Sequence, residues 1–196
     1  MKPIVISLKI FLFFTLLTGI IYPLFVTGIA EVLFPSKANG SLIIKDNKVI
    51  GSALIGQQFD SMVYFSSRPS SNSYNSLLSG GSNYGTTNKK LKDVVAERKK
   101  HFISLNNLDS LTAVPSEMLF ASASGLDPHI SSEAAFLQVE RISKARNFND
   151  NQKQSLIKSI NELTEAQQFL FLGEERINVL ALNLKLDNID QPITNK

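Results

Sequence analysis

The sequence predicts an α+β protein, in which a single N-terminal transmembrane helix precedes one mixed α/β domain. Residues 10–30 form an apolar run without a formally charged side chain. The remainder is more polar and alternates short β-branched runs with segments of helical periodicity. The strands and helices show no regular βαβ order, which favours α+β. A chain of 196 residues suits one domain and an accessory segment.

The apolar run is long enough to cross a bilayer. As a helix, residues 10–30 cover roughly 31 Å, against a hydrocarbon core of ~30 Å. Gly28 and Ala30 also offer small residues at the spacing of a signal-peptidase site, so cleavage after Ala30 to give a secreted binding protein is an alternative. Signal cores usually have only ~7–15 apolar residues, and this longer run favours a retained anchor.

The charges before the run predict the topology. Lys2 and Lys9 precede it, and the positive-inside rule keeps such residues on the cytoplasmic side. We therefore expect a short cytoplasmic N-terminus (1–9), a transmembrane helix (10–34) and an extracytoplasmic, periplasmic domain (35–196).

One face of the predicted helix has small or polar side chains, namely Thr15, Gly19, Tyr22, Pro23 and Thr27. Small residues let helices approach closely, and hydroxyl groups can bond across the contact. This face predicts packing against a membrane partner. The alternative is a tolerated Gly/Pro kink in a solitary anchor.

The domain begins with a predicted hairpin. Its strands are Ser41–Lys45 and Val49–Ile55, joined at Asp46-Asn47. Residues 60–88 are rich in Ser, Asn and Gly and nearly lack aliphatic side chains. Such a stretch is too long for a structureless linker within a domain, so it predicts an ordered functional surface.

Three helices are predicted after residue 88. The first has an apolar stripe from Leu91 to Leu105, and the second starts at a cap on Asp127 or Ser131 and runs to about Arg146. The third follows a cap at Asp150, and Gly173 ends the helical region.

Two further strands are predicted. One is Ser116–Ser122. The other lies in the tail RINVLALNLKLDN, where leucines alternate, although Val179, Leu182 and Leu186 also fit a helix.

Composition excludes several kinds of site. The absence of cysteine excludes disulfides, thiol nucleophiles and cysteine-based metal centres. With only His101 and His129, we expect no metal site. A net charge of +3 without clustered aromatic residues gives no argument for nucleic acid.

The sequence lacks the motifs of independent ATP chemistry. No glycine precedes a lysine, as a phosphate-binding Walker loop requires. No aspartate precedes a lysine, as in the phosphorylated Asp-Lys-Thr-Gly sequence of P-type pumps. The chain is therefore not expected to be an enzyme.

Ser124, Asp127 and His129 are the three residue types of a hydrolase triad, but the G-x-S-x-G elbow is missing. Asp127 is better explained as a helix cap. Gln138 lies beside an apolar helical stripe, either satisfied by neighbouring backbone or held ready for a partner.

The segment LLSGGSN raises the question of nucleotide binding, because LSGG resembles part of the signature loop of ABC transporters. A structural explanation is a turn in which the paired glycines supply backbone angles closed to other residues. A cluster of backbone N–H groups there could still receive an anion or a partner's carbonyl groups.

Several segments together resemble the C subunit of potassium-transporting P-type ATPase complexes, the KdpC family. They are FPSKANGSLI, GSALIGQQF, YFSSRPS, SGGSNYGTTN, SASGLDPHIS and GEERINVLALNLKLD, and the resemblance extends from about Lys9 to Asp187. SGGSN and SGLDPHIS downstream of a single N-terminal span are the most specific.

The resemblance implies a non-catalytic accessory subunit of a bacterial inner-membrane complex for high-affinity, ATP-driven potassium uptake. The implied partners are a channel-like potassium-binding subunit, a P-type ATPase subunit and a small hydrophobic subunit. The implied roles are assembly, stability and that of a catalytic chaperone raising the pump subunit's ATP affinity. No cofactor of its own is implied. Candidate partner or nucleotide contacts are Ser79, Gly80, Gly81, Ser82, Asn83, Asp127, His129, Gln138 and Arg141.

The predicted topology conflicts with direct ATP contact. It places Ser79–Asn83 and Gln138 outside, across ~30 Å of hydrocarbon from cytoplasmic ATP. We therefore expect an outward-facing cap on the channel subunit, which affects ATP affinity only through coupling within the complex. The alternative function is a membrane-anchored extracytoplasmic binding protein or hydrolase.

Overall fold

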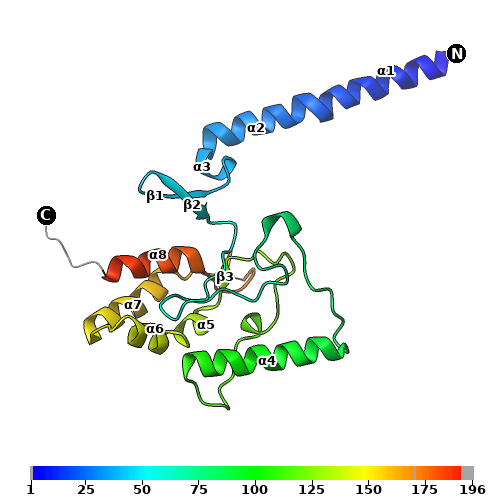
Figure 1. The fold of residues 1–196 in the computed structure, drawn as a ribbon. Coiled ribbons are helices and arrows are strands. Elements are labelled where there is room, and N and C mark those ends of the chain that lie inside the picture. The colour runs from blue at the N-terminus through cyan, green and yellow to red at the C-terminus, as the bar shows by residue number, and fades with distance from the viewer. Residues whose placement is uncertain (1, 170, 191–196) are drawn as a thin grey trace, which may run out of the picture. The chain divides into compact units, whose positions relative to one another are not determined.

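The computed structural model describes residues 2–169 and 171–190 and divides the chain into two compact units, Met1–Ser52 and Ala53–Lys196. The first unit holds a long apolar helix and a hairpin, and the second holds a mixed helix and strand domain (Figure 1). The predicted α+β class with an N-terminal apolar helix is confirmed.

The first unit begins with a continuous helix, Lys2–Leu33. It consists of α1 (Lys2–Leu16), a π-helical turn η1 (Leu17–Ile21) and α2 (Tyr22–Leu33). A proline ring inside an α-helix clashes with the carbonyl group four residues earlier, and the wider π-turn precedes Pro23. The most apolar window has a mean hydropathy of 2.4 and none of it is buried, so the helix is long and apolar enough to span a membrane.

A short helix α3 (Pro35–Ala38) leads into the hairpin of β1 (Leu42–Lys45) and β2 (Lys48–Ser52). Asp46 and Asn47, the two turn residues, both have positive φ, +50° and +61°. Asp and Asn tolerate this conformation, which tight hairpin turns favour. The predicted hairpin is confirmed, although its second strand ends at Ser52 rather than Ile55.

The second unit packs its helices around one core. The helices are α4 (Lys89–Asn106), α5 (Ser132–Phe136), α6 (Val139–Ala145), α7 (Asp150–Leu163) and α8 (Val179–Asp190). Two 3-10 turns, η2 (Ser76–Leu78) and η3 (Ser116–Met118), and the two-residue strands β3 (His129–Ile130) and β4 (Ile177–Asn178) complete it. The fully buried side chains of Phe65, Ile142, Leu156, Ile160 and Leu182 are part of the core.

Two predicted helices are confirmed. The Asn88 side chain caps α4 by accepting from the Lys90 N–H group at 2.8 Å. Helix α7 begins with a reciprocal capping box between Asn149 and Gln152, so the cap is Asn149 and the predicted cap Asp150 is the first helical residue. Helix α7 ends at Leu163 and α8 follows Gly173, so the prediction that Gly173 ends the helical region was wrong.

The predicted single helix up to Arg146 is two helices, because Gln138 interrupts it. The backbone N–H group of Gln138 donates to Ala135 O at 3.0 Å instead of the Ala134 carbonyl. The Gln138 side chain donates to Ala134 O in its place, at 3.1 Å. Of the two caps considered, Ser131 is used and accepts from the Ala134 N–H group. The break between α5 and α6 therefore lies at Leu137 and Gln138.

The two further predicted strands were wrong. Ser116–Met118 is a 3-10 turn, in which the Ser116 carbonyl accepts from both Leu119 and Phe120. In the tail the strand is limited to Ile177–Asn178, next to an isolated bridge between Arg176 and Glu165, and α8 buries Val179, Leu182 and Leu186. Spacings of three and four put these side chains on one helical face. Burial of that face against the core favours the helix over the strand for this segment.

Glycines at 125 and 173 provide a test of the packing around residues 70–80. Both have a left-handed φ, +71° and +80°. A Cβ at 125 would lie 2.5 Å from Asn72 Oδ1, whereas a Cβ at 173 would meet nothing within 4 Å. We expect Gly173→Ala to lower the free energy of unfolding by about 1–2 kcal/mol through strain alone. Gly125→Ala should cost at least about 1 kcal/mol more, because it also displaces a hydrogen-bonded amide.

Thermal unfolding of the detergent-solubilised full chain measures both variants. If both variants lose the same free energy of unfolding, then the Asn72 side chain can move aside without cost and residues 70–80 are not rigidly held.

Candidate functional site

A loop without charged residues forms the first candidate surface. We call residues 69–88 the uncharged loop, since they contain no Asp, Glu, Lys, Arg or His. Its own side chains order it: the Asn72 amide donates to the carbonyl oxygens of Asn75 and Leu78, at 3.1 and 2.7 Å. The Ser71 hydroxyl donates to the Gly80 carbonyl. The prediction of an ordered segment here agrees with this network.

A second segment, residues 122–126, holds the SGGSN part of the loop. Gly80 N–H and the Ser79 hydroxyl both donate to the Ser124 carbonyl, at 2.9 and 3.1 Å. A Cβ on Gly81 would lie 3.2 Å from the Ala123 carbonyl oxygen. The expectation that the paired glycines supply backbone angles closed to other residues was wrong, because neither has a positive φ and the left-handed residue is Asn83, with φ +54°. Gly81 instead lets two backbone segments approach closely.

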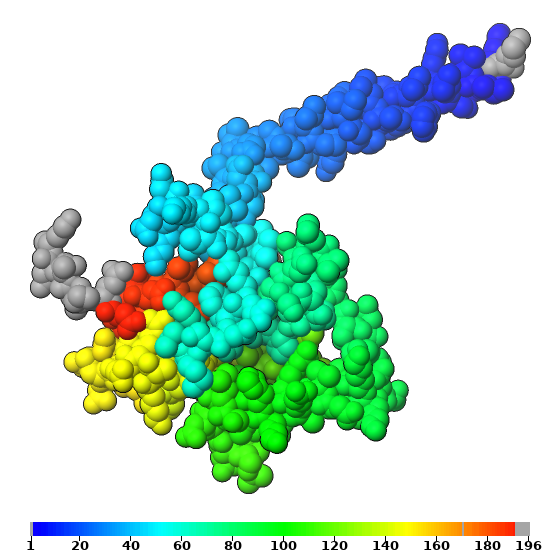
Figure 2. Space-filling model, in the orientation of Figure 1, coloured from blue at the N-terminus to red at the C-terminus, as the bar shows by residue number. Residues whose placement is uncertain are grey.

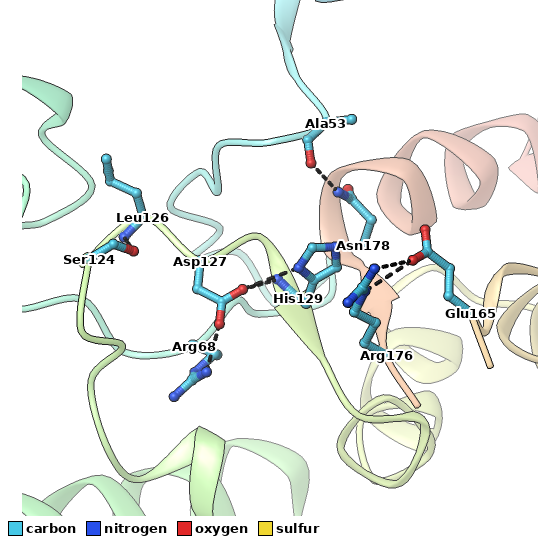
Figure 3. Close-up of polar contacts among 9 residues, drawn as sticks. All are labelled: Ala53, Arg68, Ser124, Leu126, Asp127, His129, Glu165, Arg176 and Asn178. Carbon is cyan, nitrogen blue, oxygen red and sulfur yellow. Dashed lines mark hydrogen bonds and ion pairs between the residues drawn. The ribbon is translucent and has the colours of Figure 1, made fainter. Parts of the chain in front are cut away.

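Asp127 and His129 form the second candidate cluster, together with Arg68 (Figure 3). Asp127 Oδ2 lies 2.6 Å from Arg68 Nη1, and Oδ1 accepts from the His129 backbone N–H at 3.0 Å. The His129 ring Nδ1 lies 3.3 Å from the same oxygen. Burial opposes ionisation of Asp127, but the bonds from His129 and the charge of Arg68 outweigh it and lower the pKa of the carboxyl group. Ser131 caps α5, and the Asp127 carboxylate bonds to His129 and Arg68 instead, so the predicted role of Asp127 as a helix cap was wrong.

The three residue types of a hydrolase triad are not brought together. The Ser124 hydroxyl oxygen accepts from the Leu126 N–H group at 3.1 Å, and Ser124 lies apart from the Asp127–His129 pair in Figure 3. No hydrogen bond joins Ser124 to His129 among residues 2–169 and 171–190. Within those residues, no group of three or more His, Cys, Asp or Glu side chains could hold a metal ion.

Two hollows flank Arg68. One, of about 650 Å³, lies between α4 and residues 58–74 and is lined partly by Arg98 and His101. The other, of about 580 Å³, is lined by Asp127, His129 and residues 174–176. Their charges are of both signs, so neither has the uniformly basic lining that a polyphosphate requires.

Gln138 and Arg141 lie in the interior, with 0% and 4% of their surfaces exposed. Arg141 uses all five of its N–H groups. The acceptors are the carbonyl oxygens of Ser61, Met62 and Tyr64 and the side-chain oxygens of Asn106 and Gln138, at 2.6–3.3 Å. Burial lowers the pKa of the Arg141 guanidinium to about 10. We call this set the Arg141 network.

Gln138 is equally engaged. Its side-chain oxygen accepts from the Ser66 N–H and from Arg141, both at 2.8 Å, and its nitrogen donates to Ala134 O. Gln138 is therefore bonded within the domain, with neighbouring backbone groups among its partners, and is not held ready for a partner protein. Neither Gln138 nor Arg141 lines either hollow beside Arg68.

Sequence reasoning missed three residues of this interior. Asn106 positions the Arg141 Nε, and Asn183 pairs with both backbone groups of Phe65, at 2.8 and 3.0 Å. Arg146 donates to the Val63 carbonyl at 2.7 Å and to Asp187 at 3.0 Å. The available signal was an asparagine within the apolar stripe of the tail, since a buried amide needs hydrogen-bond partners.

The Arg141 network predicts a large stability effect. Arg141→Met leaves five oxygen acceptors without their donor, so we expect it to lower the free energy of unfolding by about 3–5 kcal/mol. A matched control is Arg176→Met, because Arg176 forms an exposed pair with Glu165 and its loss should cost about 1 kcal/mol or less.

Urea unfolding of the detergent-solubilised full chain, followed by circular dichroism, compares the two variants. If Arg141→Met costs no more than Arg176→Met, then the network is not what holds residues 61–66 in place.

Comparison with known proteins identifies the family. The family described as "K+-transporting ATPase, c chain", KdpC, matches residues 4–188. The chain is 47% identical over 185 residues to the potassium-transporting ATPase KdpC subunit of Mycobacterium tuberculosis (strain ATCC 25618 / H37Rv), covering 93% of this chain and 96% of the relative. The proteins of the same name from Citrifermentans bemidjiense and Geotalea uraniireducens are 46% and 45% identical, covering 96% and 97% of this chain and 98% and 100% of theirs. The chain therefore belongs to the KdpC family of potassium-transporting ATPase subunits.

Proposed function

We propose that this chain is the non-catalytic accessory subunit of a high-affinity, ATP-driven potassium-uptake complex, where it assists assembly and stability. The observation that carries the proposal is the helix Lys2–Leu33, which is long and apolar enough to span a membrane and has none of its apolar window buried. Such a surface requires lipid or other membrane helices around it. Relatives at 45–47% identity are named as subunits of a potassium-transporting ATPase.

The proposed partners are a channel-like potassium-binding subunit, a P-type ATPase subunit and a small hydrophobic subunit. The helix offers places for close approach: a Cβ on Gly19 or Gly28 would meet nothing within 4 Å. A shallow hollow of about 500 Å³ surrounds Gly28, lined by Leu24, Ile29 and Val32 among others. Thr15, Gly19, Tyr22, Pro23 and Thr27 form the proposed packing face, because small residues and hydroxyls associate helices in lipid.

The proposed orientation has the N-terminus in the cytoplasm and the second unit outside the bacterial inner membrane. Lys2 and Lys9 support it through the positive-inside rule. In this orientation, the chain caps the channel subunit on the side where potassium enters.

A catalytic-chaperone effect on the pump subunit's ATP affinity would then be a coupling free energy transmitted through the complex. The engagement of both ends of the Gln138 amide supports this version, since a nucleotide contact there would require breaking the Arg141 network. No cofactor of the chain's own is proposed.

Association tests the role of the anchor. Deleting residues 1–34 should abolish co-purification with the other transporter subunits, because it removes the membrane contact. An unrelated transmembrane helix of equal length serves as the matched control. It should restore membrane attachment but not full association, since it lacks the face around Gly19. A truncated chain that still co-purifies stoichiometrically would contradict the proposal.

Protease access tests the orientation and, with it, direct ATP contact. Trypsin added to intact spheroplasts should cleave the second unit, because α4 has exposed Lys89, Lys92 and Lys99. A cytoplasmic marker protein must stay intact in the same sample. Protection of the second unit until detergent is added would place it in the cytoplasm and make direct nucleotide contact possible again.

A further inference from the structure

Two adjacent leucines in the uncharged loop are exposed to solvent. Leu77 is 90% exposed and Leu78 is 67% exposed, both within the 3-10 turn η2. The loop forms a teal-green lobe of the surface (Figure 2). Burying a leucine side chain is favourable by about 1.5–3 kcal/mol, so a pair held in water marks a contact surface.

The loop holds these leucines in a fixed place. The Leu77 N–H group donates to Asn75 Oδ1 at 3.0 Å, and the Leu78 carbonyl accepts from Asn72 at 2.7 Å. Ser73 and Tyr74 both have left-handed φ angles, +53° and +59°. Such angles persist in residues other than glycine only where surrounding contacts enforce them.

A hydrogen bond from Tyr74 fixes the start of the uncharged loop. Its hydroxyl donates to the Arg68 carbonyl at 2.5 Å, and burial raises the pKa of Tyr74 to about 12. The phenol therefore stays a hydrogen-bond donor at all physiological pH values. A rigid base means that little conformational entropy is lost when the leucines are buried by a partner.

The chemistry of the loop identifies the occupant. Residues 69–88 have no charged side chain, whereas loops and helices that bind membrane surfaces rely on Lys and Arg beside their apolar residues. The partner surface that fits is an uncharged, apolar hollow on a protein.

We propose that Leu77 and Leu78 form a docking knob, which inserts into an uncharged apolar hollow on another subunit of the transporter. The inference rests on the proposed function for the existence of that subunit. Because the loop is uncharged, the contact should be insensitive to salt.

The chain contains no cysteine, so single cysteines report on single positions. Leu77→Cys probes the knob, and Leu111→Cys is a matched control because Leu111 is also 90% exposed. The experiment measures the rate of maleimide labelling of each full-length variant, free in detergent and in the assembled complex. Assembly should slow labelling at 77 by at least about tenfold, since reaction requires opening of the contact, and leave the rate at 111 unchanged.

The neighbour is identified by crosslinking. The Leu77→Cys variant is labelled with a maleimide photocrosslinker before reconstitution and then irradiated in the complex at low and high salt. A covalent product with another transporter subunit, equal at both salt concentrations, supports the proposal. Products with lipid or with a second copy of this chain, or none at all, would overturn it.

The outcomes separate this inference from the proposed function. If the wild-type chain does not assemble with the other subunits, then the proposed function fails. If the wild-type chain and the Leu111→Cys variant assemble but the Leu77→Cys variant labels as fast in the complex as it does alone, only the docking knob is rejected.

Discussion

The second unit depends on one buried cation. Among the residues that the structure describes, no carboxylate pairs with the Arg141 guanidinium, and removing such a charge from water costs several kcal/mol. Five oxygen acceptors offset that cost, and three of them are carbonyl groups of Ser61, Met62 and Tyr64. Residues 61–64 therefore have to keep an irregular path with their carbonyl groups turned towards α6. The network ties this segment to α4 through Asn106 and to the break between α5 and α6 through Gln138.

Polar side chains take the place of strand pairing around residue 65. An extended segment normally satisfies its N–H and C=O groups by pairing with neighbouring strands. Phe65 instead pairs both backbone groups with the Asn183 side chain, and Ser66 donates to Gln138. Further hydrogen bonds fix the residues that follow. The Arg68 side chain pairs with Asp127, and the Arg68 carbonyl oxygen accepts from Tyr74 at the base of the uncharged loop. A rigid interior thus supports a largely irregular loop, and Leu77 and Leu78 are held at its surface.

Prediction from the sequence succeeded where local physics decides the structure. The hairpin at Asp46-Asn47 and the helices α4 and α7 follow from turn preferences, caps and apolar periodicity. It failed where contacts with residues far away in the sequence decide the structure. The Gln138 side chain accepts from the Ser66 N–H group and replaces the bond of its own backbone to Ala134 O, which interrupts the helix. Leucines in the tail fit a strand or a helix until burial against the core selects one helical face. For the candidate site, the sequence predicted candidate residues but not what they contact. The motifs led to Gln138 and Arg141, but only the fold shows that their polar groups are used within the domain.

This placement changes how functional effects of substitutions are understood. Gln138 and Arg141 belong to the same network, so removing either one leaves buried acceptors or donors unpaired and loosens residues 61–66. A weaker ATP affinity of the complex after a change at Gln138 would therefore follow equally from a lost nucleotide contact and from a loosened domain that docks poorly. Surface positions separate the two explanations, because Leu77 and Leu78 have exposed side chains and can be changed without opening the core. If coupling to ATP passes through docking, then it should respond to the leucine pair while the stability of the domain stays constant.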